Sequence, residues 1–146
     1  ALRGLKTLSL RMRQQCDNAL TLATWLQTHP KVGHVNYAFL PDHPQYELLH
    51  RLTEGKGGGG VFSFEILGAG RAQVFAFMDA LDLIQPATSL GDIYSLVLYP
   101  VISSHRTLTP EERAKLGIGE DLVRISAGIE DVADIKADIE RALAVA

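Results

Sequence analysis

The chain has 146 residues, 47% of them hydrophobic, which suits one domain with a substantial core. Its 14 basic and 17 acidic residues give a formal net charge of −3 at pH 7, so it has no excess of positive charge for nucleic-acid phosphates. No apolar run approaches the roughly 20 residues of a membrane-spanning helix, and Cys16 is the only cysteine. We therefore expect a single-domain cytoplasmic protein whose partners are neither nucleic acid nor membrane.

A long helix is predicted at the start of the chain, because apolar residues recur there every three or four positions. It should end near His29, since Pro30 disfavours helical geometry in the residue before it. The apolar stripe consists of Leu5, Leu8, Met12, Cys16, Ala19, Ala23 and Leu26. The helical pattern begins close to Ala1 without a convincing capping residue, so we expect a fragment that starts inside an element; a processed N-terminus would look the same.

The rest of the chain alternates between strand and helix patterns. Strands are expected at residues 32–37, 61–66 and 122–126, with an uncertain extended segment at 85–90. Helices are expected at residues 45–52, 74–81, from 110 onward, and 132–143. Few of the strands have the continuous apolar runs of a buried parallel sheet. The pattern predicts an α/β (α+β) domain, with helices packed on a mostly antiparallel sheet.

Arg124 carries the clearest chemical signal. Alternation along its predicted strand places it on the face opposite Val123 and Ile125. Leu122 and Ser126 share its face. The fixed donor fork of a guanidinium matches a carboxylate, so a bound carboxylate is one way to satisfy this residue. The alternative is an edge-strand arginine that reaches solvent or pairs with a nearby glutamate, and strand position alone favours that alternative.

Other familiar site patterns are missing from the sequence. The glycine cluster at 57–60 lacks the Lys-Ser/Thr ending of a phosphate-binding loop. The histidines lack metal-ligand spacing, and no serine stands in a nucleophile-elbow motif. We expect no metal site in this chain, and a hydrolase triad is not supported.

Six short motifs stand in order along the chain. They are Arg-Gly-Leu-Lys-Thr-Leu at 3–8, Leu-Arg-Met at 10–12, His-Pro-Gln at 43–45, Ser-Phe-Glu at 63–65, Ser-Leu-Gly-Asp at 89–92, and Leu-Val-Arg-Ile-Ser-Ala-Gly-Ile-Glu-Asp at 122–131. Together they resemble the C-terminal domain of the pyridoxal-phosphate-dependent Cys/Met metabolism (trans-sulfuration) family. That family includes methionine γ-lyase, O-acetylhomoserine sulfhydrylase and cystathionine γ-lyase.

The resemblance implies that residues 1–146 form the small C-terminal, substrate-recognition domain of an aspartate-aminotransferase-like enzyme. The reaction implied is γ-elimination or γ-replacement on sulfur amino acids or O-acylhomoserine. The cofactor, pyridoxal phosphate, would be bound mainly by an N-terminal domain absent from this chain. The lysine that forms the Schiff base is expected upstream, and Lys6 is not that lysine. The chain alone should be inactive.

The resemblance also implies roles for residues and partners. Arg124 and Ser89, with the neighbouring Thr88, would bind the α-carboxylate of a small amino-acid substrate. Asp92 and Tyr94 would influence specificity: Tyr94 stands where many relatives have Glu, and Asp92 favours methionine γ-lyase or the sulfhydrylases. The implied partners are the protein's own N-terminal domain and further copies of itself, as a tetramer in the intact form.

A second hypothesis remains open at the level of sequence. The chain would then be a standalone, non-catalytic α/β binding or interaction module that keeps the fold and lacks the chemistry. The coding region immediately upstream of Ala1 distinguishes the two, because only the first hypothesis requires a lysine-bearing cofactor domain there.

Overall fold

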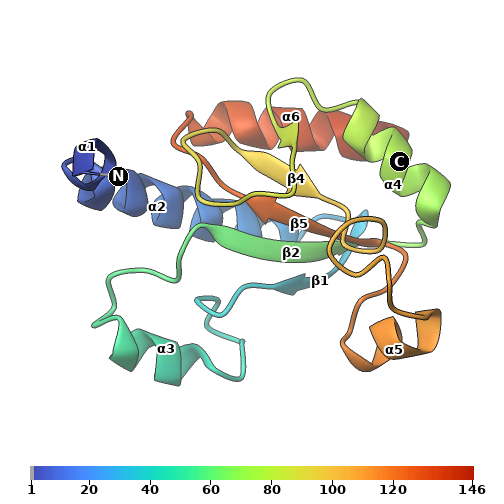
Figure 1. Ribbon diagram of the computed structural model, residues 1–146, viewed down its shortest axis with the longest axis horizontal. Helices are drawn as coiled ribbons and strands as arrows, with labels where there is room; N and C mark the ends of the chain where they lie inside the picture. The colour runs from blue at the N-terminus through green and yellow to red at the C-terminus, as the bar shows by residue number, and fades with distance from the viewer. Residues whose placement is uncertain (1) are drawn as a thin grey trace.

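Within residues 2–146, which the computed structural model describes, five strands form one sheet in the spatial order β1-β2-β5-β4-β3 (Figure 1). The strands are β1 (Val32–Asn36), β2 (Val61–Ile66), β3 (Gln85–Pro86), β4 (Leu96–Leu98) and β5 (Leu122–Ser126). The pairs β1–β2, β2–β5 and β4–β5 are antiparallel, and β3–β4 is parallel. The predicted fold class is therefore confirmed. Ala1, where a truncated first element was expected, lies outside the described residues.

The helices are α1 (Leu2–Leu5), α2 (Leu8–Leu26), α3 (Tyr46–Leu52), α4 (Arg71–Asp79), α5 (Pro110–Lys115) and α6 (Val132–Val145). Capping explains where two of them begin. Thr109 accepts a hydrogen bond from the Glu112 amide at the start of α5, and Asp131 accepts one from the Ala133 amide at the start of α6. The described helices include none with the length and apolar character needed to cross a membrane.

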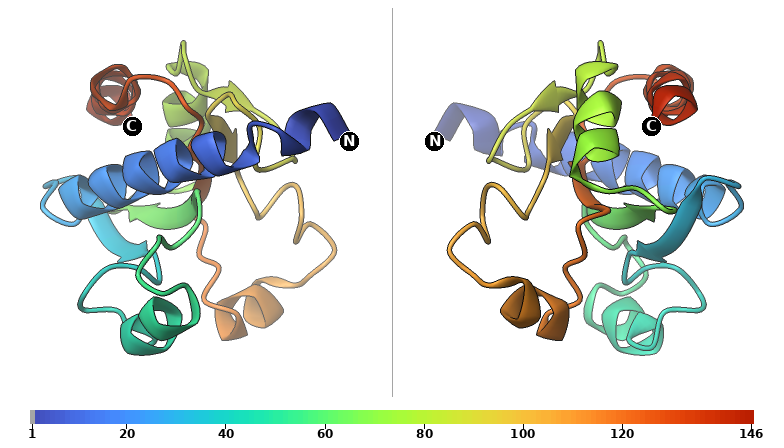
Figure 2. Two further views of the ribbon diagram at one scale, coloured as in Figure 1. Left: turned by 90° about the vertical axis from the view of Figure 1, so that its left-hand side faces the viewer. Right: turned by 90° about the vertical axis from the view of Figure 1, so that its right-hand side faces the viewer.

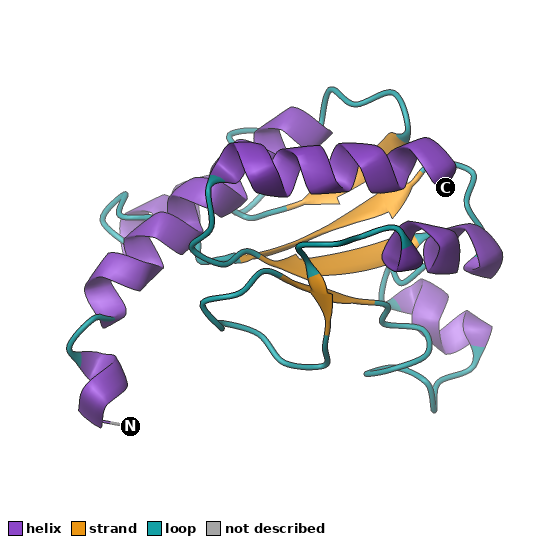
Figure 3. Ribbon diagram, turned by 90° about the horizontal axis from the view of Figure 1, so that it is seen from above, coloured by secondary structure: helices purple, strands orange, loops and turns teal. Residues whose placement is uncertain are grey.

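One face of the sheet forms the core. Phe62 and Phe64 of β2, together with Val123 and Ile125 of β5, are buried on this face. The apolar sides of α2, α4 and α6 pack against it, and Figure 3 shows α2 and α6 lying over the strands. Because side chains alternate along a strand, residues between these positions face the other side of the sheet.

The long first helix was predicted only in part. A turn at Lys6 and Thr7 interrupts the predicted helix, so α1 and α2 are separate helices. At the other end α2 stops at Leu26, because His29 and Thr28 bond to carbonyls three residues back instead of four. The stripe is buried from Cys16 onward, whereas Leu5, Leu8 and Met12 are exposed. Figure 2 shows the reason: α1 and the start of α2 extend beyond the sheet.

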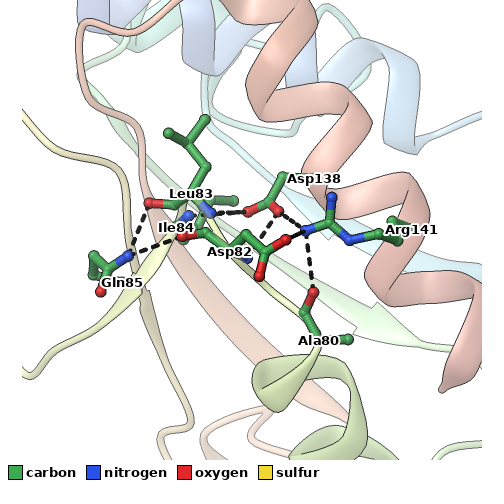
Figure 4. Close-up of polar contacts among 7 residues, drawn as sticks. All are labelled: Ala80, Asp82, Leu83, Ile84, Gln85, Asp138 and Arg141. Carbon is green, nitrogen blue, oxygen red and sulfur yellow. Dashed lines mark hydrogen bonds and ion pairs between the residues drawn. The ribbon is translucent and has the colours of Figure 1, made fainter.

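A buried carboxylate fixes the segment that leads into β3. Asp138 of α6 is 3% exposed and accepts hydrogen bonds from three consecutive backbone amides, those of Asp82 (2.9 Å), Leu83 (3.0 Å) and Ile84 (2.9 Å). Arg141, one turn further along α6, pairs with both Asp138 and Asp82 (Figure 4). This arrangement, the Asp138 clamp, attaches the start of β3 to α6.

Candidate functional site

Arg124 lies in the middle of the sheet. Its strand, β5, runs between β2 and β4, where Arg124 is opposite Ser63 on one side and Leu98 on the other. The alternative of an edge-strand arginine is therefore wrong. Strand order depends on contacts between residues far apart in sequence, so the local pattern could not have indicated this position. Its side chain lies on the face away from α2, α4 and α6, as alternation predicts.

The guanidinium of Arg124 is only partly satisfied by the protein. Its Nη2 atom donates to the carbonyl of Ser89 at 3.0 Å. The Nε atom is buried and has no acceptor among residues 2–146, and no carboxylate in that part of the chain forms an ion pair with Arg124. Burial lowers the pKa of Arg124 from its ordinary value, yet an arginine remains charged at neutral pH. A buried charged donor without a partner is costly, so the site suits an external anion.

Ser89 belongs to the connection between β3 and β4, residues 87–95, which we call the Ser89 loop. Its carbonyl faces Arg124, and within the described residues its hydroxyl makes no hydrogen bond. Thr88, next to it, is exposed and lines a hollow of about 220 Å³ together with Pro86 and Leu98. Leu98 is the partner of Arg124 across the strands, but Arg124 itself does not line this hollow.

Asp92 and Tyr94 lie on the same loop, but neither side chain bonds to Arg124 in the described part of the chain. The Asp92 carboxylate accepts a hydrogen bond from the amide of Ile93 at 2.7 Å, which is a contact within the loop. The Tyr94 ring is 60% exposed. Both side chains are thus available to a ligand or to another part of the protein.

Sequence reasoning missed the residues that hold the Ser89 loop. Ser126 accepts a hydrogen bond from the Gly91 amide at 2.9 Å, and Gln15 of α2 donates to the Asp92 carbonyl at 2.6 Å. At the end of the loop, Glu130 accepts from both the amide (2.6 Å) and the hydroxyl (2.9 Å) of Ser95. Of these residues, only Ser126 could have been found from the sequence, because alternation along the strand places it on the same face as Arg124, two residues away. The other partners lie far apart in sequence.

A larger hollow lies elsewhere, between β1 and the turn that follows it. It measures about 530 Å³, and four of its polar side chains pair with one another: His43 lies 3.1 Å from Asn36, and Gln27 donates to Asp42 at 2.8 Å. Among residues 2–146 no three metal-ligating side chains gather in one place. Among the described residues, the buried side-chain atom without a hydrogen-bond partner is therefore Nε of Arg124.

Comparison with known proteins gives the family of the chain. Residues 1–144 match the family described as Cys/Met metabolism PLP-dependent enzyme. The chain belongs to that family. A member named L-methionine gamma-lyase from Pseudomonas deceptionensis is 49% identical over 142 residues, and one named O-succinylhomoserine sulfhydrylase from Pseudomonas aeruginosa is 44% identical over 143 residues. These alignments cover 97% and 98% of this chain and 35% of each relative.

Solved structures of the family have the same fold. A putative O-acetylhomoserine (thiol)-lyase from Campylobacter jejuni, which contains a pyridoxyl-lysine phosphate, superposes with a TM-score of 0.91 at 31% identity. A cystathionine gamma-lyase from Lactobacillus plantarum, in complex with L-serine, superposes with a TM-score of 0.85 at 34% identity. The matches cover 98% of this chain and 34% and 36% of theirs. The chain thus spans about a third of the length of the relatives it matches.

The lysines of this chain do not fit the covalent anchor of pyridoxal phosphate. Lys31 donates to the carbonyls of Leu143 and Ala144 at the end of α6, and Lys136 lies over the Trp25 ring. The remaining lysines, Lys6, Lys56 and Lys115, are exposed. A Schiff base requires a neutral amine, which burial promotes and exposure does not. Among the described residues, no lysine therefore has the buried surroundings that suit a covalent anchor for the cofactor.

Proposed function

We propose that residues 1–146 are the C-terminal substrate-recognition domain of a pyridoxal-phosphate-dependent lyase or transferase that acts on sulfur amino acids or O-acylhomoserines. The names of its relatives, both lyases and sulfhydrylases, support the reaction class. The observation that carries the proposal is Arg124, a central-strand guanidinium with a buried, unpartnered Nε atom. In this proposal its missing partner is the α-carboxylate of the substrate.

Arg124 binds the carboxylate through its donor fork, and the Ser89 carbonyl fixes the rotation of the guanidinium through the contact at Nη2. The Ser89 hydroxyl and Thr88 lie beside the carboxylate and complete its binding. Asp92 and Tyr94 contact the remainder of the substrate and influence which one is accepted. Holding the carboxylate in one place orients the bonds at Cα, which is a contribution to rate through positioning.

The remaining functions belong to an N-terminal domain outside this chain. That domain binds pyridoxal phosphate and carries the lysine that forms the Schiff base. When bound, the cofactor supplies the electron sink of the reaction. The intact protein is a cytoplasmic homo-oligomer, a tetramer, as its family resemblance implies. The isolated chain is expected to be inactive.

The test replaces Arg124 by Ala and by Lys in the full-length protein. Hydrogen bonds to charged groups contribute about 1.5–3 kcal/mol, and about 1.4 kcal/mol corresponds to a factor of ten. We therefore expect KM for the amino-acid substrate to rise roughly 10- to 100-fold in Arg124→Ala. Lysine keeps the charge and loses the fork, so it should recover only part of the affinity.

Two controls separate a binding defect from a folding defect. The visible absorbance of the bound cofactor should not change in either variant. The corresponding amine, which lacks the carboxylate, should bind equally to wild type and to Arg124→Ala. An unchanged KM for the amino acid would refute the assignment of Arg124. Turnover by the isolated chain, with its length verified by mass spectrometry, would refute the division of roles between the two domains.

A further inference from the structure

Residues 88–94 of the Ser89 loop are held by their backbone. Side chains of residues 88–94 are all exposed, so burial does not fix the position of this stretch. The loop is instead attached through the Ser89 carbonyl, the Gly91 amide, and the carbonyls of Asp92 and Ile93. The position of the loop therefore depends on a small number of hydrogen bonds.

Two of these bonds come from one strand and one face of it. Arg124 and Ser126 are two residues apart on β5, and they contact Ser89 and Gly91, which are also two residues apart. Ser126 is 1% exposed, so the strand and its neighbours fix its hydroxyl in place. Arg124 has the longer side chain of the two, so its orientation depends on the contact between its Nη2 atom and the Ser89 carbonyl.

The backbone conformation of Gly91 allows the loop to contact Ser126. Its φ of +76° lies in the left-handed region, which favours glycine, and a side chain added there would meet no atom within 4 Å. Space is therefore not the reason for glycine at this position. The backbone conformation directs the Gly91 amide at Ser126 while the Ser89 carbonyl faces Arg124.

We infer that Ser126 is a positioning residue for the carboxylate site. Its hydroxyl holds the Gly91 amide, and through Gly91 it keeps the Ser89 carbonyl where it orients Arg124. Ser126 touches neither substrate nor cofactor in this assignment. The inference rests on the proposed function, because it matters only if Arg124 binds the substrate carboxylate.

The test uses two pairs of variants in the full-length protein. Ser126→Ala removes an acceptor of a backbone amide, and Thr109→Ala does the same at the start of α5. Gly91→Ala introduces backbone strain in open space, and Gly117→Ala does the same after α5, where φ is +70°. Thr109 and Gly117 are therefore matched controls for the loss of stability.

We expect Ser126→Ala and Gly91→Ala to raise KM for the amino acid roughly 3- to 10-fold with little change in kcat, as the loss of one hydrogen bond implies. Thr109→Ala and Gly117→Ala should leave KM unchanged although both lower the midpoint of urea unfolding. In an Arg124→Ala background, Ser126→Ala should change KM no further, because the loop then has no guanidinium to orient.

The outcomes distinguish the two claims. If Arg124→Ala raises KM while Ser126→Ala and Gly91→Ala behave like their controls, the positioning role is wrong and the proposed function stands. Full additivity of Ser126→Ala and Arg124→Ala would also refute the positioning role. If Arg124→Ala leaves KM unchanged, both claims are wrong.

Discussion

Tyr99, the residue that follows β4, makes the stability of the protein sensitive to alkaline pH. It is 1% exposed, and its hydroxyl donates to the backbone carbonyl (2.7 Å) and the carboxylate (3.0 Å) of Glu120. Burial, followed by the hydrogen bond to Glu120, raises the pKa of Tyr99 to about 12 from an ordinary value of 10.0. The folded protein therefore keeps a proton that the unfolded chain loses.

The direction of the effect follows from this difference in proton binding. Between pH 10 and about 12 the unfolded state binds fewer protons than the folded state, so the free energy of unfolding falls as the pH rises. Burial also raises the pKa of Tyr37, which adds to the slope. We expect Tyr99→Phe to reduce this slope in urea unfolding measured across that range. An unchanged slope would contradict the prediction.

The sequence predicted some residue-scale features because they depend on near neighbours. The face of Arg124 followed from alternation, and the burial of Cys16 followed from helical spacing. The partners of Arg124 did not follow. Ser89 and Gly91 reach β5 across 35 residues of chain, and no local pattern encodes such a contact.

At the scale of elements, the Asp138 clamp joins α6 to the segment before β3. Asp138→Ala would leave three backbone amides without their acceptor and Arg141 without its buried partner. We expect the free energy of unfolding to fall by about 3–5 kcal/mol, as when one partner of a buried ion pair is removed. Urea unfolding at neutral pH measures this change.

The matched control for Asp138 is Asp134→Ala on the same helix. Asp134 is exposed and lies in the first turn of α6, where a carboxylate contributes about 0.3–1 kcal/mol through the helix dipole. Similar losses for the two variants would mean that the three amides find other acceptors. The sequence offered one clue to the clamp, because Asp138 lies directly beside Ile139 on the apolar side of α6.

Element prediction failed where the local signal was weakest. β4 was missed because it has three residues, all buried, and so shows no alternation. β3 has two residues, of which one is Pro86, and it exists only because β4 lies beside it. Longer elements such as β2, α2 from Cys16 onward, and α6 were predicted well, since each spans enough residues to show its own period.

At the scale of the whole molecule, the N-terminal helices present an uncovered apolar surface. Leu2 is 80% exposed, Leu5 60% and Leu10 66%, and Figure 2 shows α1 extending away from the sheet. Exposed apolar patches promote association. We expect the isolated chain to self-associate at increasing concentration, as measured by light scattering.

Substitution tests where that association occurs. The double variant Leu5→Glu/Leu10→Glu should shift the isolated chain toward the monomer. Leu116→Glu is the control, because Leu116 is similarly exposed (61%) after α5. A clean monomer over a wide range of concentration in the unsubstituted chain would contradict the prediction.

A binding loop must keep its position and also select its ligand. In the Ser89 loop the backbone keeps the position, so the exposed side chains are left to select the ligand. Residues 88–94 are held by main-chain amides and carbonyls, and Ser95 at the end of the loop is held by Glu130. The exposed side chains at positions 88, 92 and 94 make no hydrogen bond to β5 in the described chain. Exchange of these three side chains therefore leaves the attachment intact. Directed evolution of substrate preference can therefore vary positions 92 and 94 without removing the hydrogen bonds that attach the loop to β5.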